Sequence, residues 1–178
     1  MPVEPRVPAT SARTKRRTFV AIDFETADNG RDSACAVALV RVEGGRIVDQ
    51  KMHLIRPPRS TFLFTGIHGI TWAQVQRERT FDAVWSALAP MLVDAEFVAA
   101  HNAPFDKGVL HACCRAHGIP APAHPFVDTV KIARDTWNLR PTRLPDVCRH
   151  LNIALKHHDP MSDAGACAQI IIAANADR

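Results

Sequence analysis

The 178-residue sequence contains no apolar run approaching the ~20 residues that cross a bilayer, which argues against a membrane-spanning helix. Its first stretch, MPVEPRVPATSARTKRR, lacks the apolar core of a secretory signal, so we expect a cytoplasmic protein. The sequence also lacks an internal repeat and any sign of a second domain. A chain of this length is therefore expected to fold around one core.

Cysteines are few and odd in number, and two of the five, Cys113 and Cys114, are adjacent. This pattern is not that of a disulfide framework. The segment HACCRAH places His111, Cys114 and His117 near one face of a predicted helix, which leaves a zinc site open. A structural zinc site normally needs four ligands at recognised spacings, so the alternative is that these thiols are buried in the core.

Acidic residues are scarce at the start of the chain, while the formal net charge is +4. Among residues 1–17 a single acid, Glu4, accompanies five basic residues: Arg6, Arg13, Lys15, Arg16 and Arg17. We expect residues 1–17 to form a basic, solvated and disordered arm, with a nucleic-acid-binding tail as the alternative. The folded domain is expected over 18–176.

The periodicity of apolar residues predicts the order of elements after the arm. Strands are expected over 19–25, on both sides of a hairpin turn at 43–46, over 96–100 and over 125–129. A loop is expected over 66–71, and helices over 81–93, 102–118, 129–137, 143–153 and 159–174. Asn102, Asp128 and Asp159 are the expected N-cap residues. This order predicts an α/β fold in which helices flank a mixed five-stranded sheet.

The first predicted strand, within FVAIDFET, is apolar and then carries Asp23 and Glu25. Residues two apart in a strand point to the same face, so these carboxylates lie side by side. Asp106 and Asp163 each lie about one turn into a predicted helix. If the strands that end at Asp23 and Asn102 are neighbours, Asp23, Glu25 and Asp106 share one edge of the sheet, and Asp163 can complete the cluster.

These motifs contain no matching Lys or Arg, so a cation is the expected counter-charge. Oxygen ligands select hard divalent ions, and two Mg²⁺ or Mn²⁺ ions about 4 Å apart can stabilise the attacking and leaving oxygens of phosphodiester cleavage. Taken singly, each acid has a simpler explanation as a surface or helix-capping residue. Their coincidence favours the metal site.

His158 is the candidate general base. It stands just before the predicted cap Asp159, and its spacing to Asp163 is that of two residues that pack together at a helix start. A histidine beside metal-bound carboxylates is suited to accept a proton from water. The alternative is an ordinary loop histidine, like the adjacent His157.

Three motifs, DFET, HNAPFD and HDPMSD, resemble those of the DEDDh family of DnaQ-like 3′–5′ exonucleases, which includes the proofreading epsilon subunit of bacterial DNA polymerase III. The segment IHGIT resembles the substrate loop of that family. The resemblance extends from Thr18 to about Ala174. It implies an RNase H-like fold, two bound Mg²⁺ or Mn²⁺ ions, the metal ligands Asp23, Glu25, Asp106 and Asp163, and His158 as general base.

The resemblance also implies removal of nucleoside 5′-monophosphates from the 3′ ends of single-stranded nucleic acid, with DNA as the expected substrate. RNA trimming by the same chemistry and a non-catalytic nucleic-acid-binding module are the alternatives. A polymerase or repair partner is compatible with the family but cannot be identified. Ile70 could offer an apolar surface to the terminal base or belong to the core. The implied substrate contacts are Phe24, Thr26, His68, Gly69, Ile70, Asn102 and Phe105.

Overall fold

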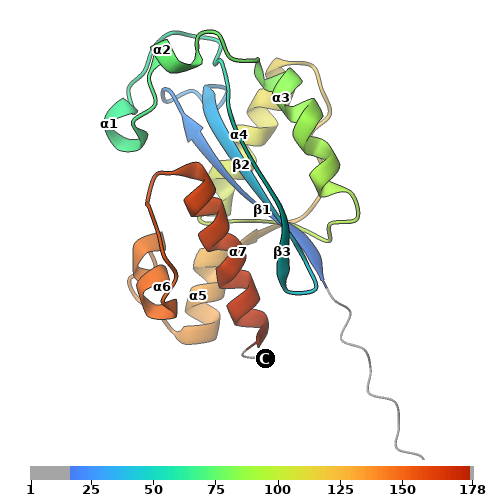
Figure 1. Ribbon diagram of the computed structural model, residues 1–178, viewed down its shortest axis with the longest axis vertical. Helices are drawn as coiled ribbons and strands as arrows, with labels where there is room; N and C mark the ends of the chain where they lie inside the picture. The colour runs from blue at the N-terminus through green and yellow to red at the C-terminus, as the bar shows by residue number, and fades with distance from the viewer. Residues whose placement is uncertain (1–16, 177–178) are drawn as a thin grey trace, which may run out of the picture.

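The computed structural model describes residues 17–176 and is built around a five-stranded sheet in the order β3-β2-β1-β4-β5 (Figure 1). An antiparallel meander joins β1 (Thr18–Thr26), β2 (Ala34–Glu43) and β3 (Arg46–Leu54). The shorter strands β4 (Val98–Ala100) and β5 (Phe126–Asp128) run parallel to β1. The predicted mixed five-stranded sheet is therefore confirmed.

Helices cover both faces of the sheet, which separates the core into two layers (Figure 1). One layer packs under α3 (Phe81–Leu88) and α4 (Ala103–Ala116). The other packs under α5 (Thr129–Trp137), α6 (Leu144–Leu151) and α7 (Pro160–Ala176). Among residues 17–176, no helix is both long enough and apolar enough to span a bilayer.

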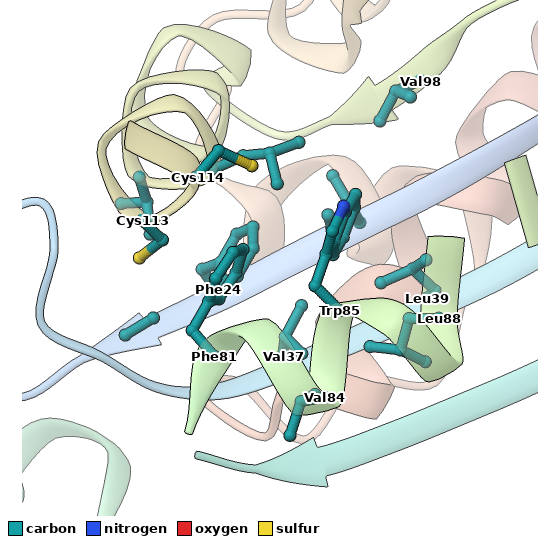
Figure 2. Packing of buried hydrophobic residues seen from close by; sticks show 14 of the residues in the cluster. Phe24, Val37, Leu39, Phe81, Val84, Trp85, Leu88, Val98, Cys113 and Cys114 are labelled. Atoms are coloured by element: carbon teal, nitrogen blue, oxygen red, sulfur yellow. The ribbon is translucent and has the colours of Figure 1, made fainter. Parts of the chain in front are cut away.

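Side chains of β1 alternate between the two layers, as the two-residue period of a strand requires. Val20, Ile22 and Phe24 pack toward α3 and α4, where Figure 2 shows Phe24 beside Phe81 and Trp85. Phe19 and Ala21 face α7. By the same alternation, Asp23 and Glu25 end the strand on the α7 side, the side that carries Asp163.

Two segments differ from the predicted elements. The one-turn helix α1 (Thr65–His68) overlaps the loop predicted over 66–71, and α2 (Trp72–Val75) begins directly after that loop. The helix predicted over 81–93 ends at Leu88 and continues as the 3₁₀ turn η1 (Ala89–Leu92). Pro90 explains this second change, because proline lacks the N–H that would extend the α-helical ladder.

The predicted capping side chains form capping hydrogen bonds at two of three helices. The Asp128 carboxylate accepts the Val130 N–H at 3.0 Å, and the Asp159 carboxylate accepts the Ser162 N–H at 3.1 Å. Asn102 does hold the N-cap position of α4, as predicted, but its side chain makes no capping hydrogen bond. Asn102 has a left-handed backbone (φ 64°, ψ 52°) instead of the extended conformation of a capping residue. Its N–H donates to Asp128 at 3.0 Å.

The zinc alternative for HACCRAH is not supported by the described part of the chain. Cys113 and Cys114 are buried in the layer under α4 (Figure 2), and His117 pairs with Asp82 at 3.2 Å. No set of three metal-ligating side chains among residues 17–176 includes His111, Cys114 or His117. The basic arm predicted for residues 1–17 lies outside the described residues, apart from Arg17.

Candidate active site

The pairing of β1 with β4 brings the candidate residues to one edge of the sheet. Val20 pairs with Val98 and Ala21 with Ala99, so Asp23 lies near the turn that leads from β4 into α4. A cavity of about 690 Å³ opens there. All four predicted acids and both histidines before α7 line it: Asp23, Glu25, Asp106, Asp163, His157 and His158.

Three of the four carboxylates form a tight group. Oxygens of Asp23, Glu25 and Asp163 lie within 4.8 Å of one another. Asp106, which is 2% exposed, lies outside that group, and one of its oxygens accepts the Phe24 N–H at 2.9 Å. This hydrogen bond joins the first turn of α4 to the end of β1. It fixes Asp106 beside the strand that carries Asp23 and Glu25.

Two oxygens of this group are buried without a hydrogen-bond partner, Oδ2 of Asp23 and Oδ1 of Asp163. An unsatisfied buried polar atom costs about 1–3 kcal/mol, and more when it is charged. No Lys or Arg among residues 17–176 forms an ion pair with any of the four acids. The arrangement therefore has the donor atoms and the unbalanced charge of a site for hard divalent cations.

The pKa values of the carboxyls reflect the same unbalanced charge. Burial raises the pKa of Glu25 to about 7, and the charges of Asp163 and Asp159 add to the shift. Burial also raises the pKa of Asp23 well above its usual range, with further contributions from Asp106 and Asp163. Burial likewise raises the pKa of Asp106 and of Asp163. A bound cation would relieve this repulsion and favour the ionised forms.

The two histidines before α7 contact Asp163 in different ways. Nδ1 of His157 lies 2.9 Å from Oδ2 of Asp163, and the backbone N–H of His158 donates to the same oxygen at 3.0 Å. The two rings stack with centroids 3.8 Å apart. His158 has a left-handed backbone (φ 66°), a strained conformation for a residue other than glycine. The sequence analysis missed the His157 contact, and the only signal for it is that the two histidines are adjacent.

His68 connects the predicted substrate loop to the end of β1. Its Nε2 lies 3.1 Å from the Thr26 carbonyl, and its Nδ1 accepts the Ile70 N–H at 3.0 Å. These contacts assign a neutral ring that donates through Nε2, and burial lowers the pKa of His68 accordingly. Gly69 ends α1 with φ 76°, a left-handed conformation that favours glycine.

Ile70 is 7% exposed and packs in a third cluster with Ala27, Cys35 and Val75, which favours its core interpretation. It also lines a second cavity of about 530 Å³ with His68, Gly69 and His158. Ile67, on the exposed side of α1, is 54% exposed and was not among the predicted contacts.

The remaining predicted substrate residues differ in exposure. Asn102 and Phe105 line the main cavity, and the Phe105 side chain is 37% exposed. The side chains of Phe24 and Thr26 are buried. The sequence analysis missed one wall of the main cavity, which is formed by His101, Val130, Arg134, Arg140, Pro141, Thr142, Arg143 and Leu144.

Comparisons with known proteins identify the family of the chain. The exonuclease family model RNase_T matches residues 20–171. The PolC-type DNA polymerase III of Thermotoga maritima is 31% identical over 159 residues, which cover 87% of this chain and 12% of that polymerase. The chain thus spans about an eighth of the length of this relative.

Among solved structures, exonuclease X in complex with 5′ overhanging duplex DNA is 26% identical, with a TM-score of 0.71 and coverage of 88% of this chain and 90% of that chain. The nuclease domain of 3′hExo, a DEDDh family member bound to rAMP, has a TM-score of 0.78 at 18% identity, with 93% and 95% coverage. These neighbours confirm the predicted RNase H-like fold. The chain therefore belongs to the exonuclease family.

Proposed function

We propose that this enzyme releases nucleoside 5′-monophosphates from the 3′ end of single-stranded DNA, with two Mg²⁺ or Mn²⁺ ions held by Asp23, Glu25, Asp106 and Asp163. Exonucleases of this family depend on divalent metal ions. The observation that carries the proposal is the pair of buried, unpartnered oxygens on Asp23 and Asp163 within an all-oxygen donor set. When bound, the ions would supply positive charge at the attacking and leaving oxygens.

His158 is the proposed general base. It borders both cavities, so it stands between the carboxylate group and the loop that carries His68 and Gly69. A ring nitrogen there can accept a proton from the attacking water. His157 contacts Oδ2 of Asp163, so Oδ1 of the same carboxylate stays available to the cation.

The proposed substrate contacts surround the carboxylates. Asn102 and Phe105 offer a polar side chain and an exposed ring at the start of α4, suited to a sugar or phosphate and to a base. On the other side, the proposal includes His68, Gly69 and Ile70 of the substrate loop. The proposal also includes Phe24 and Thr26, at the end of β1.

RNA is the second candidate substrate. The complexes of the two structural neighbours contain duplex DNA in one case and rAMP, which carries a 2′-OH, in the other. A non-catalytic binding module is disfavoured because all four acids line one cavity. The match to a PolC-type polymerase suggests a replication setting in the cytoplasm, but the shared segment is a small part of that protein and identifies no partner.

The test compares 5′-labelled single-stranded DNA and RNA of one sequence, with Mg²⁺ and with EDTA. We expect stepwise shortening from the 3′ end with Mg²⁺, faster on DNA, and none with EDTA. The Asp163→Asn variant is expected to be inactive on both. Shortening in EDTA contradicts the metal mechanism, and faster cleavage of RNA reverses the substrate assignment.

A further inference from the structure

The main cavity combines an acidic half with a basic half. The acids come from β1, α4 and α7, whereas the basic side chains come from α5 and the loop before α6. Val130 and Arg134 both line the cavity and lie four residues apart on α5, so they share one face of that helix. Arg140 and Arg143 follow in the loop. This basic wall has no role in the metal site.

The guanidinium groups of this wall differ in whether they have a partner within the protein. Nε of Arg143 pairs with Asp146 at 2.8 Å, and Arg149 contacts the same carboxylate at 3.2 Å. Within residues 17–176, the side chains of Arg134 and Arg140 form no ion pair and no hydrogen bond. None of the three arginines pairs with the four acids of the site. Arg134 and Arg140 are therefore available to an anion in the cavity.

His101 holds this wall against the sheet. Its Nδ1 lies 2.8 Å from the Thr129 hydroxyl at the start of α5, and its Nε2 lies 2.9 Å from the Thr142 carbonyl. Thr129 and Thr142 are both buried. Because His101 directly follows β4, the loop that carries Arg140 is fixed to the same sheet edge that positions the acids. The hydrogen bonds of His101 thus fix the backbone segments that carry the arginines, and such preorganisation favours binding.

We propose that Arg134 and Arg140 bind backbone phosphates of the nucleotides upstream of the scissile bond, an inference that rests on the proposed function. The scissile phosphate belongs beside the carboxylates, where cations supply its counter-charge. A second phosphate of the same strand needs its own cationic group, and guanidinium binds phosphate in a bidentate geometry. Such contacts fix the strand without reading its sequence. The cavity volume of about 690 Å³ lies near the middle of the range for ligand sites.

The experiment compares two substrates, a single-stranded oligonucleotide and the p-nitrophenyl ester of thymidine 5′-monophosphate. The ester contains the scissile phosphate but no upstream nucleotide. We expect Arg134→Ala and Arg140→Ala each to raise KM for the oligonucleotide about tenfold, the scale of one charge-assisted hydrogen bond, and to leave ester hydrolysis unchanged. Each lost contact should also lower the slope of log KM against log salt by about 0.7. Arg115→Ala, at an exposed site on α4 outside this cavity, is the matched control.

Equal losses on both substrates would overturn the inference, because they indicate a structural role, and so would unchanged kinetics on both. If the wild-type enzyme hydrolyses neither substrate, the proposed function fails first. Fluorescence anisotropy with a labelled oligonucleotide then decides the inference separately. Unchanged affinity in the Arg134→Ala, Arg140→Ala double variant would overturn it, and weakened, less salt-dependent binding would support it.

Discussion

Nδ1 of His157 lies 2.9 Å from Oδ2 of Asp163, and the ring of His158 takes no part in that contact. His158 reaches the same oxygen only through its backbone N–H, at 3.0 Å. Oδ2 thus has two donors, while Oδ1 of the same carboxylate is buried and has none. This asymmetry orients Asp163, because the oxygen left without a donor is the one available to a cation.

Divalent ions should stabilise the fold through these unpartnered oxygens. An ion at about 100 times its dissociation constant adds about 2.7 kcal/mol, which corresponds to roughly 5–10 °C in melting temperature for a domain of this size. We expect Mg²⁺ or Mn²⁺ to produce such a rise and Asp23→Asn to abolish it, measured by thermal melts with ions and with EDTA. Asp135→Asn, an exposed change on α5, should keep the full rise. A full rise in Asp23→Asn would remove Asp23 from the metal site.

The metal-free protein should lose stability as the pH rises. Burial raises the pKa of Glu25 from 4.5 to about 7 in the folded state. A raised carboxyl pKa contributes stability that is complete below pH 4.5 and is lost as the pH rises through about 7. We expect the melting temperature in EDTA to fall across this interval and Glu25→Gln to flatten the fall. Exposed Glu78→Gln is the control, and a slope that is the same in wild type and Glu25→Gln would contradict the assignment.

Local periodicity was sufficient to predict most of the fold and the acid cluster. Asp23 and Glu25 follow the two-residue period of β1, and Asp163 follows the helical turn after the Asp159 cap. These rules depend only on neighbours along the chain. The one long-range step, β1 beside β4, entered the sequence argument only as a condition, and the parallel pairing of the two strands meets it.

The features that could not be predicted depend on single dihedral angles or on distant partners. Asn102 and His158 have positive φ, which removes the expected side-chain cap in one case and places the adjacent ring on Asp163 in the other. No residue type in those segments requires that backbone. The basic wall is held by His101 and Thr142, 41 residues apart in sequence, and no local pattern joins them.

Two isoleucines of the predicted substrate loop are expected to have different roles, one in the core and one in substrate binding. Ile70 is buried among Ala27, Cys35 and Val75, so Ile70→Ala should cost about 2–5 kcal/mol of unfolding free energy. Ile67 is exposed on α1, so Ile67→Ala should leave stability nearly unchanged and raise KM if the terminal base packs there. Denaturant unfolding and oligonucleotide kinetics measure the two effects. A small stability loss with a large KM rise in Ile70→Ala would restore Ile70 as the nucleotide contact.

His158 and His157 offer the sharpest test of the proposed chemistry. If His158 accepts the proton of the attacking water, its removal affects the transition state. General-base contributions are typically about 10²- to 10⁴-fold, so His158→Ala should lower kcat by that factor. The metal ligands and the phosphate contacts remain, so KM and the thermal shift with Mn²⁺ should change little.

His157→Ala is the internal control, because it removes the ring that lies on Asp163 but keeps the His158 N–H on the same oxygen. A hydrogen bond of this kind contributes about 0.5–1.5 kcal/mol, so the loss should be about tenfold or less. That loss should appear mainly as weaker metal binding, because His157 orients a ligand and does not accept the proton. Kinetics at saturating Mn²⁺ should therefore restore His157→Ala and leave His158→Ala defective. If saturating metal restores the activity of His158→Ala while His157→Ala stays defective, His157 is the base and the assignment from motif spacing is wrong.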